Sequence, residues 1–214
     1  LQTIIPRAFK EAKIKIKDID LFCAACGPGL IGGLLVGSTM AKSMAIGNNK
    51  PFYPINHLEG HILSPLMTNK INFPFLTLLL TGGHTQIYFV KKIGNYQLLG
   101  ETVDDAVGES FDKVAKLLGL GYPGGPFIEE KAINKSTDTF QLPHPLEFEK
   151  SLNFSFSGIK TAVSLLIKKQ DYIDEKMIIK IATSFQNKII EILVKRTTLA
   201  LKALKKKGYD IKDI

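Results

Sequence analysis

The stretch FLTLLLTGGHTQIYFVKKIGNYQLLGETV, residues 75–103, decides the fold of this chain. It contains three candidate strands, of which the first is apolar and the second alternates polar with apolar residues: 75–80, 85–90 and 96–103. Such runs are typical of β-strands, and the dipeptides Gly82-Gly83 and Gly94-Asn95 between them are typical of tight turns. The stretch therefore predicts three consecutive strands in an antiparallel meander.

Helix and strand patterns alternate around this meander. Upstream we expect a helix from Pro6 to about Lys15, a strand over 20–26, a helix over about 29–46, a strand over 51–55 and a helix over 57–67. Downstream we expect helices over 105–118, 127–134, 157–169 and 174–207, with Ser157 as an N-cap and Gly208 as a C-terminal stop. The pattern changes character near Phe73. The chain is therefore predicted to be α/β, with two regions, 1–73 and 74–214.

Composition and charge narrow the class of protein. The 214 residues are 45% hydrophobic and 22% charged, which excludes a disordered or fibrous chain. The net charge of +8 is compatible with a nucleic-acid partner, while the dense run Lys205-Lys206-Lys207 also fits a solvated helix end. No signal peptide is visible, and the glycine-rich stretch 29–47 is too short and broken to cross a bilayer, so we expect no membrane partner.

The two cysteines, Cys23 and Cys26, have the C-x-x-C spacing found in metal and redox sites. No second pair of cysteines completes a zinc site, and both residues lie in an apolar run. We therefore expect them to be small buried residues, in a protein from a reducing compartment.

Two histidines, His57 and His61, lie four residues apart within NHLEGH, residues 56–61. On a helix this spacing puts both side chains on one face, one turn apart. Imidazoles so placed can share one zinc or iron ion, with further ligands from elsewhere, although a histidine pair without a metal also fits the spacing. A zincin needs glutamate directly after the first histidine, and Leu58 stands there, so the motif disfavours a metalloprotease.

Two glycine-containing stretches have the composition of anion-binding or ribose-binding loops. Gly82-Gly83 either leaves backbone N–H groups free to hold an anion or forms only a hairpin turn. YPGGP, residues 122–126, opens a helix whose N-terminus can hold phosphate or ribose. Each motif is weak when taken singly.

An acidic stripe is expected on the helix over 105–118, because Asp105, Glu109 and Asp112 are spaced by four and three residues. These acids either complement the helix dipole or meet a cation or a ligand. FSFSG, residues 154–158, does not match the G-x-S-x-G motif, so we predict no hydrolase nucleophile there.

Taken together, five ordered motifs resemble one family: CGPGLIGGLLVG (26–37), NHLEGH (56–61), LTGGHTQIYFV (80–90), ETVDDAVGESFDKVAKLLGLGYPGGP (101–126) and FSFSGIKTAV (154–163). The set closely resembles the TsaD-type tRNA N6-adenosine threonylcarbamoyltransferases, once called glycoproteases, over nearly the whole chain. The FSFSG form resembles their bacterial and mitochondrial branch. The resemblance implies the two-lobed actin-like ATPase fold of the ribonuclease H-like class, with 1–73 in the first lobe and 74–214 in the second.

The resemblance implies an acyltransferase. It would move the threonylcarbamoyl group from L-threonylcarbamoyl-adenylate to N6 of adenosine 37 in tRNAs that read ANN codons, in the bacterial cytoplasm or, alternatively, the mitochondrial matrix. A TsaB-like protein and a TsaE-like ATPase would be its partners. The competing interpretations are a non-catalytic actin-like partner protein, which would be expected to lack the histidine pair, and a metalloprotease, the family's former label.

The resemblance also assigns a site residue by residue. His57 and His61 would bind one divalent metal, Fe²⁺ in preference to Zn²⁺, which would polarise the carbamoyl carbonyl group. The adenylate would be held by the end of the first meander strand and its turn: Leu79, Leu80, Thr81, Gly82 and Gly83. Asp112 and Gly125 would contact its ribose or nucleoside part, and no catalytic residue is assigned.

Both ends of the chain are expected to be cut. The family's first strand and phosphate-binding turn would precede Leu1, while a Gly-Gly turn, a nucleotide-binding Asn and a metal-binding Asp would follow Ile214. The third metal ligand would then lie outside the chain. We therefore expect the isolated 214 residues to be inactive or poorly folded.

Overall fold

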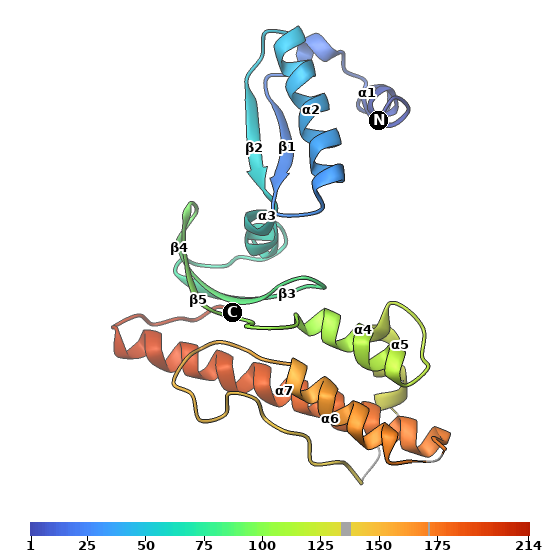
Figure 1. The fold of residues 1–214 in the computed structure, drawn as a ribbon. Coiled ribbons are helices and arrows are strands. Elements are labelled where there is room, and N and C mark those ends of the chain that lie inside the picture. Colours follow the sequence, from blue (N-terminus) through green and yellow to red (C-terminus); the bar gives the residue numbers. More distant parts are fainter. Residues whose placement is uncertain (134–137, 171) are drawn as a thin grey trace. The chain divides into compact units, whose positions relative to one another are not determined.

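The computed structural model describes residues 1–133, 138–170 and 172–214, and it divides into two compact units, Leu1–Asn69 and Lys70–Ile214 (Figure 1). The change of sequence pattern near Phe73 lies just inside the second unit. None of the helices in the described ranges combines the length and the apolar composition that a membrane span requires.

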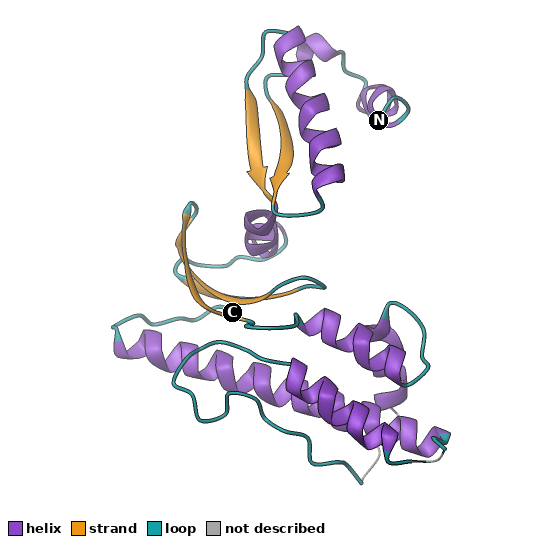
Figure 2. Cartoon of the chain, in the orientation of Figure 1, coloured by secondary structure: helices purple, strands orange, loops and turns teal. Residues whose placement is uncertain are grey.

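The first unit is built on two parallel strands, β1 (Phe22–Gly27) and β2 (Phe52–Asn56), which α2 (Ile31–Gly47) connects (Figure 2). Parallel neighbours need such a crossover because the chain must return to the end of the sheet where the first strand began. Before β1 lie α1 (Ile4–Ala12) and a 3-10 turn (Ile16–Asp18), and after β2 follow α3 (His57–Leu63) and a second 3-10 turn (Ser64–Met67).

The cysteines of β1 contradict the sequence prediction, because Cys23 and Cys26 are both exposed. Within the described ranges, β1 pairs with β2 alone, in a two-stranded sheet. An apolar run identifies a strand, but it does not reveal how many layers cover that strand. The prediction of two buried cysteines is therefore wrong.

The second unit begins with the meander. β3 (Phe75–Leu80), β4 (Thr85–Lys92) and β5 (Asn95–Glu101) form one antiparallel sheet in that order. Leu80 pairs with Thr85, so residues 81–84 make the turn between the first two strands. The predicted meander is confirmed, and its first strand has the predicted bounds.

In the described part of this unit, four helices follow the sheet: α4 (Val107–Leu117), α5 (Gly124–Ile133), α6 (Ser157–Lys168) and α7 (Glu175–Lys206). They gather on one side of the sheet (Figure 2). Ile87 and Phe89 of β4 share one fully buried core with Val114, Ile159 and Phe185 of the helices. Burial of each such side chain contributes about 1.5–3 kcal/mol to folding, so this core holds the unit together. The α/β fold class is confirmed.

Several helix starts differ from their predictions. α1 begins at Ile4 rather than at Pro6, and it ends before Lys13, which is left-handed with a φ of 55°. α5 begins at Gly124, and the expected last residue of that helix, Asn134, lies outside the described residues. The predicted N-cap of α6 is wrong, because Phe156 holds the cap position and Ser157 is already helical.

Candidate functional site

The histidine pair lies at the start of α3, in the first unit. The helix begins at His57 because the side chain of Asn56 accepts hydrogen bonds from the backbone N–H groups of Leu58 and Glu59, at 2.9 and 3.1 Å. His57 and His61 are exposed, and their Nε2 atoms lie 3.2 Å apart. The rings meet edge to face, with centroids separated by 4.5 Å. The structure therefore directs both Nε2 atoms at one point, as the spacing predicts.

The geometry of the pair fits one shared metal ion. Nitrogens bound at about 2.0–2.1 Å in a tetrahedral arrangement lie about 3.4 Å apart, close to the observed 3.2 Å. Imidazole is also a ligand that suits both zinc and iron. Among the residues that the structure describes, no group of three or more His, Cys, Asp or Glu side chains is arranged to hold a metal. The pair thus offers two ligands of such a site.

The turn after β3 is closed by its own threonine. Thr81 Oγ1 accepts hydrogen bonds from the backbone N–H groups of Gly83 and His84, at 3.2 and 2.9 Å, and the Thr81 N–H donates to the His84 carbonyl at 2.8 Å. Of the two alternatives for Gly82-Gly83, the hairpin turn therefore describes Gly83, whose N–H is bonded within the turn. The hydroxyl of Thr81 holds the turn in shape.

The start of α4 packs directly against this turn. A Cβ atom added at Gly108 would lie 2.8 Å from Gly82 Cα and 2.9 Å from the Thr81 carbonyl oxygen, closer than side chains tolerate. The buried hydroxyl of Thr85 accepts a hydrogen bond from Val107 N–H at 2.8 Å. Glycine at position 108 thus lets the helix approach the turn, a role that the sequence motifs did not predict.

Asp112 joins α4 to α5. Its Oδ1 atom accepts a hydrogen bond from the backbone N–H of Gly124 at 2.6 Å, which positions the first residue of α5. A Cβ atom at Gly124 would lie 2.7 Å from both Asp112 Cα and Ala115 Cβ. The glycine therefore permits close contact between the helices and brings the YPGGP loop beside Asp112.

The predicted acidic stripe is neutralised mainly by Lys113 of α4. Lys113 Nζ lies 2.5 Å from Asp105 and 2.9 Å from Glu109, and these hydrogen bonds raise the pKa of the lysine. Asp105 itself precedes the helix, which begins at Val107. The alternative in which acids meet a cation therefore holds for two of the three residues, and that cation is a neighbouring lysine.

A cavity of about 740 Å³ opens in the second unit, and we call it the candidate substrate cavity. Four of the predicted substrate residues line it: Leu80, Gly82, Asp112 and Gly125. Thr81 and Gly83 are not among its lining residues, and Leu79 is buried in the sheet. The structure therefore brings together residues from β3, its turn, α4 and α5 that are up to 45 positions apart in the sequence.

Other lining residues were not predicted. Tyr122 and Glu129 flank Gly125, and Glu129 follows it by one helical turn, a spacing that could have revealed it. Gln186 and Ile190 come from α7, which packs against α5. Because α7 lies some sixty residues downstream, no local signal in the sequence could place it at this cavity.

The serines of the FSFSG motif bind Asp104. The side chain of Asp104 accepts hydrogen bonds from the hydroxyls of Ser155 and Ser157 and from the Phe156 N–H at 2.8 Å. Burial opposes ionisation of this carboxyl group, but the hydrogen bonds outweigh burial and lower its pKa below the ordinary value. The motif thus attaches the start of α6 to the loop before α4.

Comparison with known proteins gives one consistent family. The family model for TsaD, tRNA N6-adenosine threonylcarbamoyltransferase, matches residues 1–212. Curated relatives with the same name include that of Bartonella bacilliformis, which is 50% identical over 94% of this chain and 55% of its own length. Those of Chromobacterium violaceum and Sinorhizobium medicae are 49% and 46% identical, over 90% and 99% of this chain. The chain spans 55–59% of the length of these three relatives.

Among solved structures, YeaZ from Pseudomonas aeruginosa is similar, with a TM-score of 0.37 and 12% identity over 83% of this chain and 81% of that one. The family match and the curated relatives confirm the resemblance carried by the five sequence motifs. The chain belongs to the TsaD family of tRNA N6-adenosine threonylcarbamoyltransferases.

Proposed function

We propose that the protein transfers the threonylcarbamoyl group from L-threonylcarbamoyl-adenylate to N6 of adenosine 37 in tRNAs that read ANN codons. The observation that carries this proposal is the family match over residues 1–212, together with relatives that bear the transferase name. In the proposed reaction, the N6 amine attacks the carbamoyl carbon and loses a proton. The bond from that carbon to the phosphate oxygen breaks, and AMP leaves.

The candidate substrate cavity has features of a nucleotide site. Its volume of about 740 Å³ lies within the range of roughly 300–1,000 Å³ that is typical for small-molecule pockets. Ile190 and Tyr122 offer apolar and aromatic surface to a base. Asp112 uses Oδ1 for Gly124, which leaves Oδ2 to accept a hydrogen bond from a ribose hydroxyl. We assign Leu79, Leu80, Thr81, Gly82, Gly83, Asp112 and Gly125 to substrate binding.

Three of these residues, Leu79, Thr81 and Gly83, would act without lining the cavity. Leu79 is buried and fixes the end of β3, while Thr81 shapes the turn through its bonds to Gly83 and His84. Their contribution would be to hold Leu80 and Gly82 in place. A side chain at Gly125 would meet no neighbouring atom within 4 Å, so the backbone there is open to a ligand.

A metal ion would be held by His57 and His61, with Fe²⁺ preferred and Zn²⁺ as the alternative. When bound, such an ion supplies Lewis-acid polarisation of a carbonyl group. The chain's own contribution is to fix the two imidazoles, because Asn56 sets the start of α3 and with it the direction of both rings.

The remaining proposals concern architecture and partners. We assign the two compact units to the two lobes of an actin-like fold. The partners would be tRNA, the adenylate, a TsaB-like protein and a TsaE-like ATPase. The place of action would be the bacterial cytoplasm, with the mitochondrial matrix as the alternative.

The test is threonylcarbamoyl transfer to unmodified tRNA by the full-length protein with its partners and the adenylate. The double variant His57→Ala/His61→Ala is compared with Glu59→Gln, a matched change on the same helix. We expect the wild-type protein and Glu59→Gln to produce modified adenosine. The histidine variant should lose at least about 100-fold in transfer rate, because it lacks the ligands of the proposed metal.

Two results would count against the proposal. If the wild-type protein transfers nothing while its partners are shown to be competent, the non-catalytic partner becomes the better interpretation. If Glu59→Gln abolishes activity as completely as the histidine variant, Glu59 takes part in the chemistry, as it would in a hydrolase.

A further inference from the structure

A basic groove runs between α4 and α6 in the second unit. It encloses about 670 Å³, and lysines from both helices line it: Lys113, Lys116, Lys160 and Lys168. Lys160 and Lys168 are eight residues apart on α6, which corresponds to about 12 Å along the helix. Ser164 lies between them and also lines the groove, and a hydroxyl group is a common ligand of phosphate oxygens. We call this surface the α4–α6 groove.

The groove carries more positive charge than its acids can neutralise. Lys113 is paired with Asp105 and Glu109, and Lys160 lies 4.0 Å from Asp105. Lys116 and Lys168 are exposed, and neither forms an ion pair with an acidic side chain in the described ranges. Four ammonium groups thus outnumber the three nearby carboxylates of Asp105, Glu109 and Asp112. An anionic ligand with several charges would supply the missing counter-charge.

The groove and the candidate substrate cavity have no lining residue in common, but a third hollow shares residues with each of them. A smaller hollow of about 320 Å³ is lined by Lys113 and Lys116, which belong to the groove, and by Asp112 and Tyr122, which belong to the cavity. The side chain of Tyr122 is 83% exposed at this junction. Lysines beside an exposed aromatic ring are the combination that binds the phosphates and unstacked bases of single-stranded RNA.

From these observations we infer that the α4–α6 groove binds the sugar-phosphate backbone of tRNA next to the candidate substrate cavity. The inference rests on the proposed function and deepens it, because it states where the acceptor RNA is held. The groove would neutralise phosphates close to the reacting adenosine, while the cavity holds the adenylate.

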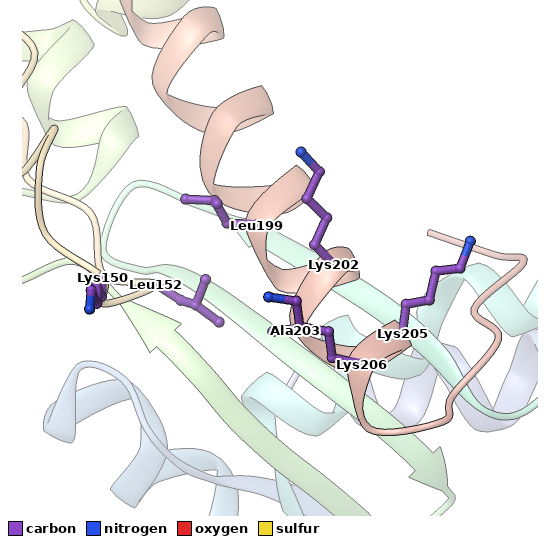
Figure 3. Close-up of a pocket in the computed structure, with 7 residues that line it drawn as sticks. All are labelled: Lys150, Leu152, Leu199, Lys202, Ala203, Lys205 and Lys206. Atoms are coloured by element: carbon purple, nitrogen blue, oxygen red, sulfur yellow. The ribbon is translucent and has the colours of Figure 1, made fainter.

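A second lysine-rich surface offers a matched control. At the end of α7, a hollow of about 690 Å³ is lined by Lys150, Lys202, Lys205 and Lys206 around Leu152, Leu199 and Ala203 (Figure 3). Figure 3 shows the side chains of Lys202 and Lys205 diverging from each other. This surface carries as many lysines as the groove, but it shares no lining residue with the cavity or with the 320 Å³ hollow beside it, whereas the groove shares Lys113 and Lys116 with that hollow. Charge alone would therefore favour both surfaces equally, whereas the hollow that adjoins both the groove and the cavity favours the groove.

The experiment compares two triple variants of the full-length protein. The groove variant is Lys116→Gln/Lys160→Gln/Lys168→Gln, and the control is Lys202→Gln/Lys205→Gln/Lys206→Gln. Lys113 is kept because it pairs with Asp105 and Glu109. The dissociation constant for unmodified tRNA is measured at several salt concentrations, and circular dichroism verifies that both variants are folded.

We expect the groove variant to bind tRNA about 10-fold more weakly at moderate salt. The slope of log affinity against log salt concentration should decrease in magnitude by about 2. Each phosphate contact to a single strand contributes about 0.7 to this slope, and the variant removes three lysines. The control should stay within about 2-fold of the wild type. An unchanged groove variant, or equal losses in both variants, would overturn the inference. The inference would also be overturned if the groove variant kept its tRNA affinity but no longer bound an acidic protein partner. The groove would then be the binding surface for that protein.

Transfer kinetics separate this inference from the proposed function. With the adenylate present, the groove variant should have a KM for tRNA about 10-fold higher than the wild type, and the same kcat at saturating tRNA. If the wild type binds tRNA but transfers nothing, the proposed function fails. The difference in tRNA affinity between the two variants then still shows whether the groove binds tRNA. If transfer proceeds and the groove variant keeps its KM, the groove is the part that fails.

Discussion

Gly124 sets the distance between α4 and α5, and therefore the shape of the candidate substrate cavity. A methyl group at this position would lie 2.7 Å from the backbone of Asp112, so one of the helices must move. We expect Gly124→Ala to lower the free energy of unfolding by about 1–3 kcal/mol, as over-packing usually does. Urea denaturation measures the change.

The neighbouring residue gives the control for this substitution. A Cβ atom at Gly125 has no neighbour within 4 Å, and alanine favours a helix over glycine by up to about 1 kcal/mol. Gly125→Ala should therefore leave the stability unchanged or slightly raised. Equal destabilisation by both substitutions would show that close packing at position 124 is not the cause.

The hydrogen bonds of Asp104 predict that the difference in stability between the wild type and Asp104→Asn depends on pH. Its pKa in the folded protein is lowered below the ordinary value of about 3.9, so the folded state favours the carboxylate. The stabilisation is therefore present above pH 4 and is lost as the pH falls from about 4 through the lowered pKa. Because Asp104 is exposed, we expect Asp104→Asn to cost only about 1–2 kcal/mol at pH 7.

Urea denaturation between pH 7 and pH 3 measures this difference. The gap in unfolding free energy between the wild type and Asp104→Asn should shrink below pH 4. A gap that stays constant, or widens as the pH falls, would contradict the assigned role of the carboxylate.

Single residues were predictable from the sequence only where their partners are local. The histidine pair could be predicted because four residues on a helix make one turn, and its two nitrogens do converge. Ser157 could not be placed correctly, because its hydroxyl group donates to Asp104, 53 residues away, instead of capping its own helix. Serine favours a helix start, but a distant carboxylate competed for its hydroxyl.

At the scale of elements, one arginine of α7 makes three hydrogen bonds to the loop before α6. Arg196 is 1% exposed and donates hydrogen bonds to the carbonyl groups of Leu146, Glu149 and Ser151. Leu146 has a φ of 58°, a conformation that a leucine rarely adopts without such support. Burial lowers the pKa of Arg196, yet its guanidinium group still supplies three hydrogen bonds that the loop needs.

We expect Arg196→Met to lower the free energy of unfolding by about 3 kcal/mol, because three carbonyl groups lose their donor. Arg196→Lys should recover part of this loss, since an ammonium group reaches fewer of the carbonyls. The adjacent Lys195→Met, which removes an exposed ion pair with Glu147, should cost less than about 1 kcal/mol. Similar losses at positions 195 and 196, measured by urea denaturation, would refute the role of Arg196.

Elements were predicted best where both ends carry local signals. α7 was expected over 174–207 and runs over Glu175–Lys206, because Asp174 accepts a hydrogen bond from Met177 N–H and Gly208 takes a left-handed φ of 85°. β3 was likewise marked by the glycine turn that follows it. The exposure of Cys23 could not be predicted, because it depends on which elements cover β1.

At the scale of the whole molecule, the sequence motifs identified the family, and the family match confirms it. The α/β class followed from alternating periodicities. Only part of the candidate substrate cavity followed from motifs, since Gln186 and Ile190 enter it from a distant helix. The side of the cavity that Gln186 and Ile190 line is formed because α7 packs on α5, and no local sequence pattern predicts such long-range packing.

The most direct test of the proposed transfer follows an isotopic label. The full-length protein and its partners are incubated with unmodified tRNA and an adenylate labelled in the carbamoyl carbon, and nucleosides and free AMP are quantified by mass spectrometry. We predict that the label appears on N6 of adenosine 37, with one AMP released for each labelled nucleoside. Release of AMP without labelled nucleoside, or no release at all, would contradict the assignment as a transferase.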